Sequence, residues 1–274
     1  MTRVAVVTGG NKGIGFAIVR GLCKKFKGDV YLTARDEGRG LAAVKELEGE
    51  GLSPKFHQLD ILSGESIKKL GAFLVDKYGG LDVLVNNAGI AFKQDSTAPF
   101  SEQAEVTLKS NYTATLNVCK GLFPILRSHA RVVHLSSMTS LNALSKCSSA
   151  LQSSLKNCKT LTDVDELMAK FEKDVKNGVH QANGWANSAY GVSKIGVTVM
   201  TPIQQAELDA DETRSDLVVN CCCPGYVDTD MTSHKGLKTI DEGAETPLYL
   251  ALLPPNSTQP RGEYVSEKKV VKWR

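Results

Sequence analysis

Two residues suited to acid–base chemistry, Tyr190 and Lys194, stand four positions apart in the run Tyr-Gly-Val-Ser-Lys. Residues four apart on a helix share a face, so both side chains would point the same way. A tyrosine has a pKa of about 10 and does not exchange its proton readily near neutral pH. A close ammonium favours the phenolate and lowers that pKa, which would make Tyr190 a usable general acid or base. Because this spacing also occurs by chance on amphipathic surface helices, its interpretation depends on the other motifs.

A serine, Ser137, follows the apolar run Val132–Leu135 and places a hydroxyl group at the end of a predicted strand. Its O–H can donate a hydrogen bond to a carbonyl oxygen that gains negative charge on accepting hydride. The alternative is a serine that only caps the next helix. His134, in the same run, is interpreted as a strand residue with a local partner and not as a base.

A glycine-rich run, Thr8–Gly15, follows a predicted strand and opens a predicted helix, as a dinucleotide-binding turn requires. Gly9 would allow the tight turn, Gly13 the approach of a pyrophosphate, and Gly15 close packing of helix on strand. The helix N-terminus would attract the phosphates. The spacing departs from G-x-G-x-x-G, and it is not a Walker A motif because Lys12 precedes the glycine it should follow. The alternative is a set of ordinary turn glycines.

The residues after the second predicted strand indicate which dinucleotide binds. NAD sites place an acid there for the ribose 2′-hydroxyl, and spacing alone nominates Asp36. However, Ala34 stands at the strand end and Arg35 follows it, and a guanidinium suits a 2′-phosphate. With Lys12 as a second cation nearby, the sequence predicts NADPH and an Asp36 that points away. The alternative is a surface pair between Arg35 and Asp36.

The run Asn-Asn-Ala-Gly ends the fourth predicted strand at Asn86–Gly89. Ligands of open α/β sheets bind outside the carboxyl ends of the strands. Small residues such as Gly89 would let a ribose or nicotinamide lie close there. The alternative is an ordinary turn.

The elements that must position these residues are short apolar strands that alternate with helices. This alternation is typical of a parallel sheet covered on both faces. The sequence therefore predicts a Rossmann-like, doubly wound α/β fold of three layers. The predicted strands are Val4–Val7, Asp29–Thr33, Lys55–Leu59, Leu81–Val85, Ala130–Leu135, Leu217–Cys221 and Tyr264–Val265. The predicted helices are Asn11–Phe26, Arg39–Glu48 and a third that ends at Tyr78.

A segment rich in Ser, Lys and Asn, Leu141–Asn187, interrupts this alternation before the helix of Tyr190. Within it, Asp163–Val175 has the periodicity of a helix with one apolar face. That face comprises Val164, Leu167, Met168, Phe171 and Val175. Because no Pro/Gly/Ser-rich linker divides the chain, we predict a single domain, residues 1–274, with a helical insert at about 141–187.

Composition argues against several classes of partner. The 274 residues carry a net charge of +3, with an isoelectric point of about 8.4, which is too weakly basic to indicate nucleic acid. No apolar run reaches the ~18 residues of a membrane span, and the N-terminus lacks the regions of a signal peptide. Seven cysteines without zinc-like spacing predict reduced thiols and no metal site. We therefore expect a cytoplasmic protein.

Together, the motifs resemble those of the short-chain dehydrogenases/reductases over nearly the whole chain. The matching motifs are Thr8–Gly15, Asn86–Gly89, the strand end at Ser137, Tyr190–Lys194 and Pro224–Gly225. Within that family the chain closely resembles the monomeric, cytosolic, NADPH-dependent carbonyl reductases of animals. The strings that carry this resemblance are Thr8–Gly15, Leu81–Lys93, Ala189–Val199 and Gly243–Leu253, together with the long insert.

The resemblance implies a role for each catalytic residue. Tyr190 would protonate the substrate oxygen as hydride leaves the nicotinamide, while Ser137 holds the carbonyl. Lys194 would bind the nicotinamide ribose and lower the pKa of Tyr190. Asn111 would hold a water in a proton relay, and no metal would take part. Cofactor contacts are implied for Asn11, Lys12, Ile14 and Arg35 at the adenosine phosphate, Asp60 and Ile61 at the adenine, Asn87 at a ribose, and Val227 and Thr229 at the carboxamide.

The resemblance also implies the substrates, which are quinones, xenobiotic ketones and aldehydes, and some prostaglandins. Relatives bind glutathione conjugates near positions that match Phe92, Gln103 and Cys223. Tyr226 stands where close relatives have a tryptophan, which bears on substrate range. The run Cys221–Cys223 is interpreted as packing residues of a buried strand, with modification of Cys223 by electrophiles as the alternative. The family uses its insert to cover the face through which related enzymes associate, so we expect a monomer.

Three alternatives to a broad carbonyl reductase stay open. The first is a prostaglandin or hydroxysteroid dehydrogenase of narrow specificity, which would differ only in the shape of its pocket. The second is a non-catalytic NADPH-binding module, and the complete set of Ser137, Asn111, Tyr190 and Lys194 argues against it. The third is a Rossmann methyltransferase, which Arg35 and the pair Tyr190 and Lys194 disfavour.

Overall fold

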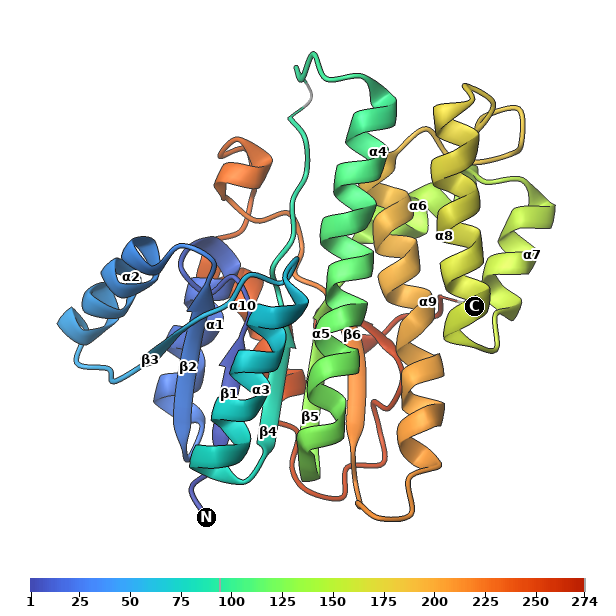
Figure 1. The fold of residues 1–274 in the computed structure, drawn as a ribbon. Coiled ribbons are helices and arrows are strands. Elements are labelled where there is room, and N and C mark those ends of the chain that lie inside the picture. Colours follow the sequence, from blue (N-terminus) through green and yellow to red (C-terminus); the bar gives the residue numbers. More distant parts are fainter. Residues whose placement is uncertain (94, 274) are drawn as a thin grey trace.

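The computed structural model describes residues 1–93 and 95–273, in which eight strands form one sheet (Figure 1). The strand order is β3-β2-β1-β4-β5-β6-β7-β8, and only the pair β7 and β8 is antiparallel. This order reverses direction between β1 and β4, the place where doubly wound folds bind nucleotides. The strands are β1 Val4–Val7, β2 Asp29–Ala34, β3 Lys55–Gln58, β4 Leu81–Asn86, β5 Leu126–Leu135, β6 Val218–Cys223, β7 Tyr264–Ser266 and β8 Lys269–Val270.

Helices cover both faces of the sheet, which confirms the predicted three layers. Apolar residues of α1 Gly13–Lys25, α2 Glu37–Gly49 and α10 Ile240–Ala251 form one core with the strands. On the other face, α3 Gly64–Tyr78, α5 Ala114–Leu122 and α9 Ala189–Asp209 do the same. Strands β1 and β4 are buried along their whole length because both faces are covered. None of the helices in the described ranges is long and apolar enough to cross a membrane.

The predicted insert consists of three helices at the right of Figure 1: α6 Met138–Lys146, α7 Ser149–Asn157 and α8 Leu161–Lys176. The periodicity predicted for Asp163–Val175 is confirmed, because α8 buries Val164, Met168 and Phe171. Leu167 packs partly buried against the same core. A capping box at Thr160 begins the helix slightly earlier than the pattern indicated.

Most differences from the predicted boundaries have local causes. Helix α1 begins at Gly13 and not at Asn11, because Lys12 is extended, with φ −163° and ψ 167°. Strand β6 continues to Cys223, so all three consecutive cysteines lie in a strand. The short antiparallel β8 carries too little pattern to be predicted. The chain between β4 and β5, where no element was predicted, forms α4 Phe100–Leu108, a π-helical turn η1 Lys109–Thr113, α5, and a 3₁₀ turn η2 Phe123–Ile125.

Candidate active site

Helix α9 presents both residues of the tyrosine–lysine pair to the carboxyl edge of the sheet. The helix begins at Ala189 because Ser188 caps it, its hydroxyl accepting from the amide of Gly191 at 3.0 Å. Tyr190 therefore lies in the first turn, and Lys194 follows one turn later. The Lys194 ammonium lies 5.6 Å from the centre of the Tyr190 ring, which confirms that both side chains share one face.

Ser137 meets this pair from the end of β5. Its hydroxyl lies close enough to the Tyr190 phenol to lower the pKa of that phenol, so the end of β5 and the first turn of α9 come together here. The same Ser137 caps α6, its Oγ accepting from the amide of Thr139 at 3.2 Å. The capping alternative and the catalytic interpretation therefore describe the same side chain, because the cap fixes the hydroxyl where it meets Tyr190.

The electrostatics of the pair differ from the sequence prediction. Burial raises the pKa of Tyr190 to about 12, while the nearby Ser137 hydroxyl acts in the opposite direction. The expected lowering of this pKa is therefore wrong for the protein by itself. Burial also lowers the pKa of Lys194 to about 8, because a low-dielectric site disfavours the ammonium as well as the phenolate. The ammonium donates to the carbonyl of Leu135 at 2.6 Å, which keeps it at the end of β5.

Asn111 lies in the π-helical turn between α4 and α5, a type of bulge that often marks functional sites. Its side chain accepts from the amide of Ile90 at 2.8 Å and donates to the carbonyl of the same residue at 2.9 Å. It also donates to the Ser193 hydroxyl at 3.1 Å, which links it to α9. A Cβ added at Gly89 would lie 3.1 Å from Asn111 Oδ1 and 3.7 Å from Lys194 Nζ. The structure thus brings Asn111 and Lys194 to one spot beside Gly89.

In the glycine-rich turn, backbone atoms lie closer together than side chains would allow, as a dinucleotide-binding turn requires. We call this turn, Thr8–Gly15, the nucleotide cradle. Gly9 and Gly13 adopt φ values of +64° and +57°, which side chains rarely allow. A Cβ at Gly15 would lie 2.3 Å from the carbonyl oxygen of Gly9 and 2.4 Å from Asn87 Nδ2. Asn87 holds the turn by donating to the carbonyls of Thr8 and Gly9 at 2.9 and 3.1 Å.

The N-terminus of α1 is open to an anion. Lys12 at the N-cap makes no side-chain hydrogen bond to the helix, and the first turn holds no acidic residue. The backbone amides of this turn can therefore meet phosphate oxygens, the usual arrangement in dinucleotide sites. Two features of this region therefore suit a dinucleotide: the glycine-rich turn and the uncapped N-terminus of α1.

The cations predicted for the 2′-phosphate differ in their surroundings. Arg35 is exposed directly after β2. Asp36 caps α2, its carboxylate accepting from the amide of Arg39 at 2.8 Å, so Asp36 is committed to that helix and the alternative pair with Arg35 does not form. Lys12 forms an ion pair at 2.6 Å with Asp230, a partner that the sequence did not predict.

The remaining predicted cofactor residues come from three parts of the chain. Asn11 and Ile14 belong to the glycine-rich turn, and both are partly buried. Asp60 and Ile61 follow β3, where the Asp60 carboxylate accepts from the amide of Leu62 at 3.0 Å. Val227 is buried after β6. Thr229 lies against the turn, its methyl group 3.3 Å from the position of a Cβ at Gly13.

A family model described as short chain dehydrogenase matches residues 3–150. Carbonyl reductase [NADPH] 3 of Rattus norvegicus is 58% identical over 274 residues, 99% of each chain. Carbonyl reductase [NADPH] 1 of the same species is 56% identical over 98% of each. The chain belongs to the short-chain dehydrogenase family. Among solved structures, salutaridine reductase from Papaver somniferum aligns with a TM-score of 0.85 and 32% identity, over 96% of this chain and 99% of its own.

The three consecutive cysteines at the carboxyl end of β6 are packed in the interior of the protein. Cys221 and Cys223 face one core and Cys222 the other, as alternation along a strand requires. Burial raises the pKa of Cys221 to about 12, in keeping with a packing role. The Cys223 sulfur accepts from the amides of Met138 and Gly225 at 3.2 and 3.3 Å, and Met138 directly follows Ser137.

The predicted glutathione-conjugate residues are not joined by hydrogen bonds in the described part of the chain. Gln103 donates its side-chain amide to the carbonyl of Ala98 at 2.8 Å, which holds the segment before α4. Phe92 is partly buried in that segment, and Tyr226 is 51% exposed after β6. The three residues therefore belong to different parts of the chain: Phe92 to the segment after β4, Gln103 to α4 and Tyr226 to the segment after β6.

A buried polar network behind Lys194 escaped the sequence analysis. His134 contacts Asn86 Nδ2 at 3.1 Å through Nδ1 and Gln204 Oε1 at 2.8 Å through Nε2. Burial lowers the pKa of His134 to about 4, so the ring is neutral, with its proton on Nε2 facing the carbonyl oxygen of Gln204. His134 is a strand residue, as the sequence analysis expected, but its partners are not local: Asn86 and Gln204 lie 48 and 70 positions away. No sequence pattern indicates Gln204.

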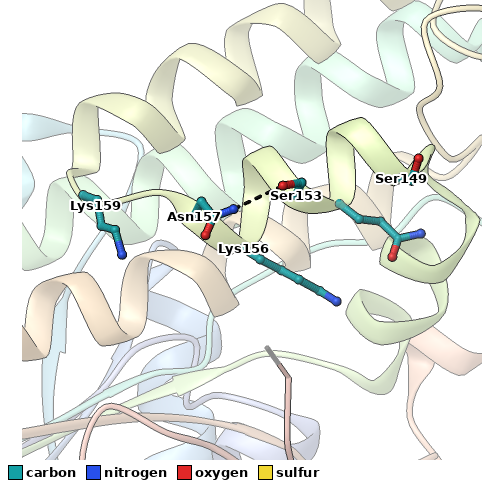
Figure 2. A pocket seen from close by; sticks show the side chains of 6 residues that line it. Ser149, Ser153, Lys156, Asn157 and Lys159 are labelled. Atoms are coloured by element: carbon teal, nitrogen blue, oxygen red, sulfur yellow. Dashed lines mark hydrogen bonds between the residues drawn. The ribbon is translucent and has the colours of Figure 1, made fainter.

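A hollow of about 600 Å³ lies away from this site, on the outer face of α7 (Figure 2). Its lining side chains are polar, and Asn157 donates to the Ser153 hydroxyl at 3.2 Å. It is open to solvent, and none of its lining side chains is acidic. Within residues 1–93 and 95–273, no cluster of His, Cys, Asp and Glu could hold a metal ion.

Proposed function

We propose that this chain is an NADPH-dependent carbonyl reductase that converts carbonyl compounds to alcohols. The observation that carries the proposal is the meeting of Ser137, Tyr190 and Lys194 beside the nucleotide cradle. Relatives of 56–58% identity over nearly the full length bear the name carbonyl reductase [NADPH], which supports the same activity. A module that only binds NADPH would have no use for the close approach of Ser137 to Tyr190.

NADPH, when bound, supplies the hydride. The glycine-rich turn and the N-terminus of α1 would hold its pyrophosphate, and Lys12 and Arg35 its 2′-phosphate. Asn11, Ile14, Asp60 and Ile61 would surround the adenosine, Asn87 a ribose, and Val227 and Thr229 the carboxamide. The support for this assignment is the cradle at Gly9, Gly13 and Gly15 and the uncapped helix end.

The residues of this chain would handle the proton. Ser137 donates a hydrogen bond to the substrate carbonyl oxygen, and Tyr190 transfers its proton to that oxygen. With a pKa of about 12, the phenol is fully protonated at neutral pH, the form that a reduction needs. Lys194 binds the nicotinamide ribose hydroxyls and stabilises the phenolate that forms. Asn111, between Gly89 and Ser193, holds a water that returns the proton.

Apolar side chains around the entrance favour apolar carbonyl substrates. Ile90, Met138, Tyr226 and Met231 are all more than a third exposed on segments that border Ser137 and the cofactor cradle. Contiguous exposed apolar side chains commonly mark binding sites. Quinones, xenobiotic ketones and aldehydes, and prostaglandins fit such a rim, and a glutathione conjugate near Phe92, Gln103 and Cys223 stays a prediction. A panel of these compounds, with NADPH oxidation followed by absorbance, tests the range.

Tyr190→Phe tests the assignment of the acid. The variant keeps the aromatic ring and loses the proton, so we expect NADPH to bind while reduction falls by about 10²- to 10⁴-fold. Binding is measured by calorimetry and reduction by NADPH oxidation with a quinone. Tyr249→Phe, at an exposed tyrosine of α10, is the matched control and should retain turnover. Near-normal turnover of Tyr190→Phe would remove Tyr190 as the acid.

We also propose that the protein is monomeric and cytoplasmic. Helix α8 lies over α4 and α9, with the Tyr112 hydroxyl donating to Asp165 at 2.7 Å and Lys176 paired with Glu105 at 3.2 Å. Met168 reaches within 3.0 Å of the position of a Cβ at Gly196. The insert thereby occupies a helical face that would otherwise be open to a second copy.

A further inference from the structure

The segment after β6, residues 226–238, folds back on itself over the nucleotide cradle. The amide of Asp228 donates to the carbonyl of Lys238 at 2.8 Å, and the amide of Leu237 to that of Tyr226 at 2.9 Å. The short helix η3 Asp230–Thr232 forms its tip, drawn in orange near the N-terminal end of α1 in Figure 1. We call residues 226–238 the clasp.

One residue of the clasp, Asp230, is contacted by lysines from two other segments of the chain. Its carboxylate pairs with Lys12 at 2.6 Å, and its carbonyl oxygen accepts from the ammonium of Lys93. Lys93 also donates to the Ser233 hydroxyl at 3.0 Å. Lys12 belongs to the turn before α1 and Lys93 to the chain after β4, so the clasp bridges the two.

A second cation keeps the Asp230 carboxylate paired. His234 contacts Asp228 at 2.7 Å through Nδ1 and Asp230 at 3.1 Å through Nε2. Both ring nitrogens face carboxylates, which only accept hydrogen bonds, so the doubly protonated imidazolium fits both contacts. The two carboxylates accordingly raise the pKa of His234, and Asp228 has the larger effect. If Lys12 moved away, Asp230 would still have His234 as a partner, which keeps the cost of that exchange small.

We propose that Asp230 sets the affinity for NADPH by competing with the 2′-phosphate for Lys12. The inference rests on the proposed function, which assigns Lys12 to that phosphate. The ammonium reaches from an extended N-cap residue, and its contact among residues 1–93 and 95–273 is the short one to Asp230. A phosphate group, with more charge than a carboxylate, must take Lys12 from Asp230 or share it. NADH lacks the 2′-phosphate and leaves the pair of Lys12 and Asp230 unchanged, so Asp230 acts on the choice between the two dinucleotides.

Asp230→Asn tests the competition, with dissociation constants for NADPH and NADH measured by calorimetry. We expect NADPH to bind about two- to fivefold more tightly, the effect of releasing an exposed ion pair, and NADH to bind as before. Asp228→Asn removes a nearby charge that does not contact Lys12 and should change NADPH binding less. Unchanged or weaker NADPH binding, or equal tightening of NADH, would overturn the inference. Thermal unfolding of each variant checks that the exposed, isosteric changes leave the fold intact.

A double-mutant cycle separates this inference from the proposed function. In a Lys12→Ala background, Asp230→Asn should have no effect on NADPH affinity, because the group for which it competes is gone. If Lys12→Ala lowers NADPH affinity but Asp230→Asn has the same effect with and without Lys12, only the competition is refuted. If Lys12→Ala leaves NADPH and NADH affinities unchanged, the assignment of the 2′-phosphate itself fails and the inference with it.

Discussion

At the scale of single residues, the chemistry depends on hydroxyl and ammonium groups that share a buried site. Burial disfavours every charged form there, so the Tyr190 phenol holds its proton and the Lys194 ammonium loses its proton more easily than in water. In the proposed mechanism, the protonated Tyr190 phenol would be the proton donor for reduction. The positive charge of Lys194 would stabilise the Tyr190 phenolate that forms after the proton transfer. It would affect the neutral phenol less.

Cofactor choice is also decided by single residues. Lys12→Ala combined with Arg35→Asp should lower NADPH affinity by about ten- to a hundredfold relative to NADH, since two charge-assisted contacts to the 2′-phosphate are lost. The kcat/KM ratio for the two cofactors measures the change. Lys24→Ala, which removes a cation from the far end of α1, is the control. An unchanged ratio would refute the assignment of the 2′-phosphate.

At the scale of elements, the site depends on how closely helices and strands approach each other. The glycine-rich turn can pass under Asn87 only because Gly15 has no side chain. The carboxyl ends of β4 and β5 and the middle of α9 are joined by the buried contacts of His134. Both features act through backbone position, so substitutions there should change binding or stability before they change the chemical step.

Gly15→Ala should weaken NADPH binding by more than tenfold and lower the melting temperature. The added methyl group would lie within 2.4 Å of Gly9 O and Asn87 Nδ2, so the turn must shift. Gly49→Ala is the matched control, because a Cβ there meets no atom within 4 Å. Calorimetry with NADPH and thermal unfolding measure both effects. If Gly15→Ala behaves like Gly49→Ala, the close approach has no importance for the cradle.

His134 should make the fold sensitive to mild acid. Its pKa is lowered to about 4 in the folded protein, while the unfolded chain takes up the proton near the ordinary value of 6.5. The unfolded state therefore binds more protons between these values, and stability falls as pH decreases through that window. From pH 7 to pH 5 we expect His134 to lower the free energy of unfolding by about 2 kcal/mol.

Urea unfolding at pH 7 and pH 5 measures this loss. His134→Gln retains an amide that can bond to Asn86 or Gln204 but cannot titrate, so its loss over the same interval should be smaller by about that amount. His57→Gln, at a partly buried histidine of β3, serves as the control for removing a histidine. Equal losses in the wild-type protein and His134→Gln would show that another group titrates.

At the scale of the whole molecule, the insert decides which surfaces stay open. Helix α8 adds an apolar layer over α4 and α9, while farther along α5 and α9 a groove of about 360 Å³ is lined by Leu116, Phe123 and Leu208. Charged side chains, among them Lys120, Glu207 and Arg214, also line this groove. An apolar face interrupted by charges and bordered by the insert is a poor match for a second copy of itself.

Light scattering should accordingly give a mass near 29.5 kDa at all concentrations up to about 100 μM, the range in which dimers of ordinary affinity form. The measurement is repeated at high salt, where charge repulsion across the groove is screened. A stable dimer under either condition would contradict the role given to the insert.

The sequence by itself determined what depends on local pattern. Apolar runs predicted seven of the eight strands, the periodicity of residues 163–175 predicted α8, and the order of motifs predicted the edge where Ser137, Tyr190 and Lys194 meet. The role of Asn111 was implied only by the family resemblance. Only the tertiary structure decided what depends on burial and on distant neighbours. The direction of the Tyr190 pKa follows from desolvation, the partner of His134 lies 70 positions away, and Asp230 lies 218 positions from Lys12. Sequence patterns extend over a few turns of chain, whereas electrostatics acts between whichever side chains the fold brings together.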